Sequence, residues 1–119
     1  AFQPAGDIAR TLRRKGLRAF TPCTLTDPTA LRRDLERTAA RGYSIDDMEH
    51  EEGVRCVGAP IRNREAEVFA SISASGPAHR VSPAREKEIA RRVMATAEEI
   101  SRRLGYRPAA IKPVRKEVG

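Results

Sequence analysis

The chain has 119 residues, of which 39% are hydrophobic and 33% charged, with no tryptophan and a net charge of +7. This length and mixture are typical of one globular domain with a core, and they exclude a disordered or collagen-like chain. No apolar run approaches the roughly 20 residues that span a bilayer, and a secretory leader is lacking, so we expect a cytoplasmic protein without membrane contact. The sequence does not begin with methionine, and we expect a fragment of a longer protein.

The N-terminal segments predict one helix and an irregular connection. Residues 4–16, PAGDIARTLRRKG, place Ile8 and Leu12 four residues apart and end in glycine, which indicates a short amphipathic helix. The next segment, LRAFTPCTLT at residues 17–26, contains β-branched and aromatic residues but is broken by Pro22. We expect an extended connection or an edge strand there.

A second helix is predicted over residues 27–42. Asp27 is suited to cap its first free N–H groups, and Pro28 fits the first turn. An apolar stripe follows, and Gly42 ends the helix.

Two strands follow, at residues 53–63 (GVRCVGAPIRN) and 67–76 (EVFASISASG), and predict an antiparallel hairpin. Pro60 should lie near an edge or a bulge, because proline cannot donate to a strand ladder. The second strand should present two faces, because alternate side chains point to opposite sides. The expected core face is Val68, Ala70, Ile72 and Ala74, and the opposite face is Phe69, Ser71, Ser73 and Ser75.

The last predicted element is a helix over residues 82–105, with Ser82 as its cap, Pro83 in its first turn and Gly105 at its end. The tail, residues 107–119, contains two prolines and is expected to be loosely held. The resulting order is helix, helix, hairpin, helix, which indicates an α+β domain with an antiparallel sheet.

The segment SIDDMEHEEGVRC, residues 44–56, is the densest group of chemically active side chains. It lacks the spacing of a zinc helix and the alternating oxygen ligands of a calcium loop, so a metal site at Asp46 and Cys56 is only a minor alternative. We expect most of the segment, including His50, to be a solvated turn, with Asp46 able to point inward. No metal and no cofactor is predicted.

The remaining candidates are a thiol and two hydroxyls. A buried, reduced thiol is the ordinary interpretation of Cys56, and with only Cys23 besides it no disulfide framework is expected. No histidine is placed to activate a nucleophile, so an enzyme is not predicted. Ser73 and Ser75 are two residues apart on one strand face, where they would be either surface hydroxyls or a polar floor for a small carboxylate.

The positive charge suggests nucleic acid as a possible partner. Basic residues occur in several segments, and in three of them acidic residues are interleaved at helical spacing. With so few aromatic side chains to stack on bases, a solvated surface is the better interpretation of most of this charge.

The motifs TLTDP, RGYSIDDMEHEEGVRCVGAPI and SISASGP stand in this order between Phe20 and Gly105. Together they resemble the effector-binding domain of the IclR family of bacterial transcription regulators. The resemblance implies a GAF-like fold: an antiparallel sheet flanked by helices, with a ligand pocket on one sheet face. It covers the later part of that domain, so residues 1–106 would be a partial effector-binding domain and residues 107–119 a basic tail.

The resemblance also implies partners and site residues. Full-length members bind DNA through an N-terminal winged helix-turn-helix, as homodimers or homotetramers, and they are not enzymes. In members similar to the acetate-operon repressor, small carboxylates such as glyoxylate or pyruvate occupy the pocket. The positions that match their contacts are Asp46, Cys56, Ser73 and Ser75. We therefore expect a sensor of a small organic acid that touches DNA only through the missing domain; the alternative is a pure oligomerisation module.

Overall fold

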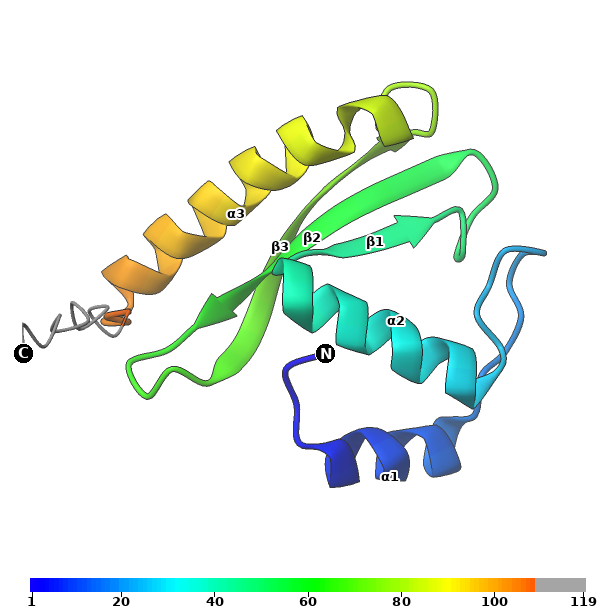
Figure 1. Ribbon diagram of the computed structural model, residues 1–119, viewed down its shortest axis with the longest axis horizontal. Helices are drawn as coiled ribbons and strands as arrows, with labels where there is room; N and C mark the ends of the chain where they lie inside the picture. The colour runs from blue at the N-terminus through cyan, green and yellow to red at the C-terminus, as the bar shows by residue number, and fades with distance from the viewer. Residues whose placement is uncertain (109–119) are drawn as a thin grey trace, which may run out of the picture.

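The computed structural model describes residues 1–108, and its centre is the hairpin that the apolar alternation predicts (Figure 1). Strand β2 (Val54–Arg62) pairs antiparallel with β3 (Val68–Pro77), which confirms the hairpin. Val57, Ala59 and Ile61 project from one face of β2 and are buried. Helix α3 (Glu86–Arg103) packs on this face through its apolar stripe, so the core lies between α3 and the hairpin.

A third strand, β1 (Ser44–Asp47), pairs with the other edge of β2, and the sheet order is β1-β2-β3. The predicted order of elements lacked this strand. Its sequence, SIDD, is short and half acidic, and it has no alternating apolar pattern from which a strand could be predicted. Pairing with the apolar β2 overrides that weak propensity.

Helix α2 (Pro28–Arg41) confirms the second predicted helix. The Asp27 carboxylate accepts hydrogen bonds from the N–H groups of Thr29 and Ala30, and Gly42 ends the helix with a φ of 89°. Helix α1 (Ala5–Lys15) ends as predicted at Gly16 and has no buried residue. Figure 1 shows α3 along one side of the sheet and α1 and α2 on the other.

The connection between α1 and α2 contains a turn and bends, so the edge-strand alternative for residues 17–26 is wrong. Hydroxyl groups hold it in place: Thr21 Oγ1 donates to the carbonyl of Met48 at 2.6 Å, and Thr24 Oγ1 donates to that of Glu49. Backbone–side-chain bonds of this kind compete with strand pairing, which explains why the β-branched residues here form no strand.

The start of α3 also differs from the prediction. Ser82 makes no side-chain cap, and a 3₁₀ turn over Pro83–Arg85 precedes the α-helix, which begins at Glu86. Proline at the first position fits either kind of turn, so the sequence could not separate them. Residues 109–119 of the expected tail lie outside the described residues.

A bulge in the hairpin changes which face one side chain occupies. The register steps from Ile61 opposite Ala70 to Arg62 opposite Val68, so Phe69 is the extra residue. Val68 therefore shares a face with Arg62 and not with the core residues, contrary to the strict alternation predicted for this strand. Pro60 lies beside the bulge, on the stretch of β2 that β1 does not reach, as expected for a proline.

The end of α3 is fastened to this bulge by a buried hydroxyl. Ser101 Oγ accepts a hydrogen bond from the Arg62 N–H at 2.9 Å and donates to the Ala97 carbonyl at 2.7 Å. Both bonds are shielded from water, because Ser101 is only 2% exposed. Among residues 1–108, no helix is long and apolar enough to cross a membrane.

Candidate ligand-binding face

The sheet register brings the four predicted site residues onto one face. Asp46 pairs with Cys56, and Cys56 pairs with Ser75, so the three form one row across β1, β2 and β3. With strands about 4.8 Å apart, this row is roughly 10 Å long. Ser73 lies two residues along β3, about 7 Å from Ser75, on the same face. This face is opposite to the one that α3 covers and lies on the side of the sheet where α2 packs (Figure 1).

A second row on this face contains residues that the sequence analysis did not single out. Ser44 pairs with Gly58, and Gly58 pairs with Ser73. A Cβ atom at Gly58 would lie 2.8 Å from Ser44 Oγ, so glycine keeps the centre of this row open. An interior strand glycine often marks such a close approach, and this signal was present in the sequence.

The hydroxyl groups of this face are accessible, and its acid and thiol are partly covered. Ser73 and Ser75 are exposed, whereas Asp46 and Cys56 are half-buried. A cavity of about 190 Å³ opens beside the second row, between α2 and the sheet, and its walls include Asp34, Thr38, Ser44, Gly58 and Ser71. It is smaller than the roughly 300–1,000 Å³ of sites for drug-sized ligands, and it suits a molecule of a few heavy atoms. None of the four predicted residues lines it directly.

Asp46 has a structural role in addition to its place on the face. Its Oδ1 atom accepts a hydrogen bond from the Glu49 N–H at 2.8 Å, which closes the turn after β1. The other carboxylate oxygen has no hydrogen bond within residues 1–108 and remains able to accept one. Asp46 is half-buried, whereas His50 is exposed, with its ring 5.1 Å from that of Phe20.

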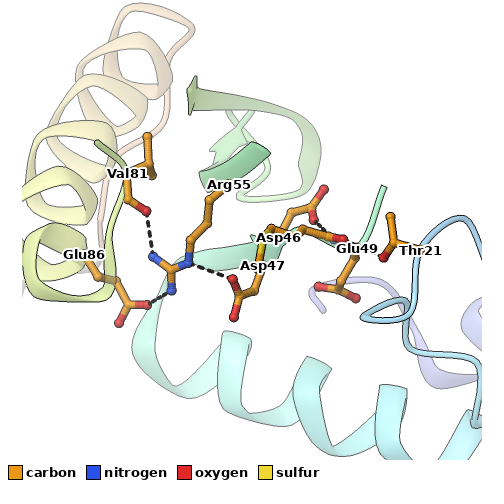
Figure 2. A network of polar contacts seen from close by, with 8 residues as sticks. Thr21, Asp46, Asp47, Glu49, Arg55, Val81 and Glu86 are labelled. Carbon is orange, nitrogen blue, oxygen red and sulfur yellow. Dashed lines mark hydrogen bonds and ion pairs between the residues drawn. The ribbon is translucent and has the colours of Figure 1, made fainter. Parts of the chain in front are cut away.

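The neighbouring acid, Asp47, points to the opposite face and joins a buried arginine (Figure 2). Arg55 is 6% exposed; its Nε donates to Asp47 at 3.2 Å and its Nη2 to Glu86 at 2.9 Å. Its Nη1 donates to the Val81 carbonyl at 3.1 Å. One side chain thus links β1, β2, the segment before α3 and the first turn of α3. The sequence predicts solvated positions for these acids, and this network is not predicted from it.

Glu49 is held in an unfavourable environment for a charge. Partial burial raises the pKa of its carboxyl above the usual 4.5, and the nearby charges of Asp46 and Asp34 raise it further. Hydrogen bonds from the backbone of Leu25 and Asp47 offset part of this effect. Because a raised folded-state pKa favours the protonated form, this residue stabilises the fold most below pH 4.5, and the contribution is lost as the pH rises through the folded-state value.

We therefore expect Glu49→Gln to raise the melting temperature at neutral pH and to leave it unchanged below pH 4, where Glu49 is already protonated in both states. Thermal unfolding followed by circular dichroism between pH 3.5 and 7.5 measures this difference. Glu52→Gln, at an exposed position in the same turn, is the control. An equal gain for both variants would show that only the net charge of the turn matters.

Neither a metal site nor a disulfide is found in the described part of the chain. Within residues 1–108, no three histidine, cysteine or acidic side chains are grouped to hold a metal ion. Cys23 and Cys56 are both free thiols. A larger cavity of about 500 Å³ lies between α1 and α2, and its walls are mostly apolar. It shares Ala1 and Leu35 with the smaller cavity, but none of the four predicted site residues lines it.

The chain is similar in sequence to known bacterial regulators. The family model for the C-terminal domain of the bacterial transcriptional regulator IclR matches residues 1–102. The transcriptional repressor IclR of Escherichia coli is 44% identical over 94 residues, which are 79% of this chain and 34% of that protein. The repressor AllR of Klebsiella pneumoniae is 39% identical over 107 residues, or 90% of this chain and 39% of that protein. The chain thus spans about a third of the length of these relatives.

Solved structures agree with the fold. The crystal structure of Thermotoga maritima IclR superimposes with a TM-score of 0.83 at 38% identity, covering 88% of this chain and 42% of that one. The C-terminal domain of the E. coli regulator KdgR superimposes with a TM-score of 0.80 at 31% identity, covering 87% and 63%. These matches confirm the predicted α+β class.

Proposed function

Because the chain belongs to the IclR family of bacterial transcriptional regulators, as part of their C-terminal effector-binding domain, we propose that its serine-lined sheet face binds a small carboxylate. The domain is regulatory rather than enzymatic, since its relatives are transcriptional repressors. The observation that supports a ligand site is the register, which sets Asp46, Cys56 and Ser75 in one row beside Ser73.

The side chains on this face suit an acid that also carries a hydroxyl or hydrated carbonyl group. Ser73 and Ser75 offer O–H donors to a carboxylate, and bonds to a charged acceptor are stronger than neutral ones. The free oxygen of Asp46 would repel a second carboxylate but accept a hydrogen bond from a hydroxyl. Hydrated glyoxylate has both groups, so it is the first ligand to test.

Binding would control DNA affinity by linkage. An effector that prefers one conformation or one oligomer shifts the population towards it, in proportion to its differential affinity. In the full-length regulator, the N-terminal DNA-binding domains would then change their spacing. Homodimers or homotetramers supply the symmetric assembly that such a change requires.

The test is a thermal-shift titration with glyoxylate, pyruvate and, as a control without a second polar group, acetate. We expect glyoxylate to stabilise the chain, and Ser73→Ala with Ser75→Ala to weaken its binding by at least about tenfold, because each lost bond to a charged group removes about 1.5 kcal/mol or more. Ser82→Ala removes a hydroxyl that makes no cap bond and should leave binding unchanged. Binding that survives the double substitution would move the site elsewhere.

The second candidate function is a pure oligomerisation module, favoured by the free edge of β3. Its ten residues carry no charge, and among the described elements only β2 pairs with it. Long, uncharged edges tend to pair with another chain. Light scattering with and without glyoxylate separates the two functions: stable assembly with no response to any acid supports the module, and assembly that shifts with ligand supports the sensor.

A further inference from the structure

Within residues 1–108, most of the excess positive charge lies in the first 26 residues. Residues 1–26 contain five basic residues and one acidic residue, whereas residues 27–108 contain 15 basic and 14 acidic ones. From residue 8 to residue 26 there is no acidic side chain at all. Basic residues do occur in several segments, as the sequence shows, but within residues 1–108 α1 and the connection after it carry most of the excess.

Of the five basic side chains in residues 1–26, Arg10 pairs with Asp7 at 3.1 Å, and the other four have no ion pair within residues 1–108. In α3, Arg92, Arg102 and Arg103 each pair with a glutamate four residues earlier. Four cations close α1 and begin the connection, and all are exposed: Arg13, Arg14, Lys15 and Arg18. None of the four has an ion-pair partner within residues 1–108; Arg18 only lies over the Phe20 ring, 5.4 Å from its centroid.

Helix capping does not account for this cluster. Basic side chains complement the negative end of a helix dipole, but α2 ends with Arg41 alone in its last turn. Three cations in consecutive positions of α1 also repel one another. Arg32 of α2 lines the same cavity as Leu12 of α1, and Figure 1 shows the end of α1 beside the start of α2. Glu36 lines this cavity too, and Asp27 caps the start of α2. With two basic residues and one acidic residue, residues 27–33 add a net charge of only +1 to the same end of the molecule.

We propose that this end of the molecule, defined by Arg13, Arg14, Lys15 and Arg18, contacts the phosphate backbone of double-stranded DNA. The choice of DNA as the polyanion rests on the domain being part of a DNA-binding regulator; the binding surface itself does not depend on the proposed effector site. Guanidinium groups bind phosphate with two parallel hydrogen bonds, and such contacts carry no sequence preference. The contact would add to that of the N-terminal domain, which was expected to be the sole DNA-binding part.

The experiment is fluorescence anisotropy of a labelled 20-base-pair duplex of arbitrary sequence, titrated with the 119-residue chain at several NaCl concentrations. We expect binding at low salt, with log K falling linearly against log salt by about 0.9 for each phosphate neutralised. Replacing Arg13, Arg14 and Lys15 by Gln should weaken binding at least tenfold and reduce that slope by about 2 to 3. Glyoxylate is absent throughout, so failure of the effector proposal would leave this result intact.

Two variants with the same loss of charge serve as controls: Lys87, Arg91 and Arg92 of α3 replaced by Gln, and Lys112, Arg115 and Lys116 of the tail replaced by Gln. Each should weaken binding clearly less than the α1 variant. Equal losses in all three would mean that net charge alone matters and would overturn the proposal, as would no binding at 20 mM NaCl. Binding to vesicles containing phosphatidylserine but not to the duplex would also overturn it. If the α1 variant loses helicity, Arg18→Gln, which lies outside the helix, should reduce the slope by about 1.

Discussion

Replacing Arg55 by Gln is expected to lower the free energy of unfolding by about 3 kcal/mol, the largest stability effect among the polar residues described. The substitution removes a 6% exposed guanidinium that connects three parts of the chain. It leaves Glu86, which is 23% exposed, and the Val81 carbonyl without their partner. Urea unfolding followed by circular dichroism measures the change.

Asp47→Asn is the matched control. It removes the charge of one Arg55 partner, and the Asp47 side chain is 61% exposed. Exposed ion pairs contribute little, so we expect a loss below about 1 kcal/mol. Comparable losses for Arg55→Gln and Asp47→Asn would show that the bond to Asp47, and not the buried links to α3, carries the stabilisation.

The second large effect is expected on ligand binding, from Gly58→Val. The new side chain would extend from the centre of the row formed by Ser44, Gly58 and Ser73, where even a Cβ atom meets Ser44 Oγ at 2.8 Å. Crowding of this kind costs about 1–3 kcal/mol of folding stability. Because the valine would also fill the space between Ser44 and Ser73, we expect glyoxylate binding to weaken by at least about tenfold, or about 1.4 kcal/mol. Isothermal titration calorimetry provides the measurement.

Gly76→Val is the control for this variant. A Cβ atom at Gly76 would lie 3.2 Å from Val81 Cγ2, on the face that α3 covers. It should therefore lower stability and leave affinity for glyoxylate intact. The opposite pattern, with Gly76→Val impairing binding and Gly58→Val not, would place the ligand on the wrong side of the sheet for our proposal.

Local sequence signals were sufficient for the elements with clear caps, terminal glycines or alternation. Caps and terminal glycines placed α1 and α2, and alternation placed the hairpin and the serine face. What they could not supply is the effect of non-local pairing. β1 forms because β2 offers an edge to pair with. Val68 changes face because of the bulge at Phe69, between the pairs Ile61–Ala70 and Arg62–Val68.

The same limit applies to the candidate site. The pairing of Asp46 with Cys56 and of Cys56 with Ser75 depends on register, which the sequence analysis could only support through a family resemblance. The sequence does not distinguish Arg55 from the surface cations, because its burial follows from contacts with Val81 and Glu86, more than 25 residues away in the chain. Gly58, by contrast, was an available local signal that was overlooked.

The two consecutive aspartates of β1 have a further consequence for how this strand finds its place. If β1 slid by one residue along β2, an aspartate would still lie on each face. A slip in one direction sets Asp47 opposite Cys56, and a slip in the other sets Asp46 opposite Arg55. The two aspartates alone therefore do not distinguish the native register from a slipped one. Ile45 does, since a slip would move its side chain from the face of Val57 to the polar face. A single isoleucine thus favours the register that aligns Asp46 with Cys56, although it belongs neither to the serine-lined face nor to the Arg55 network.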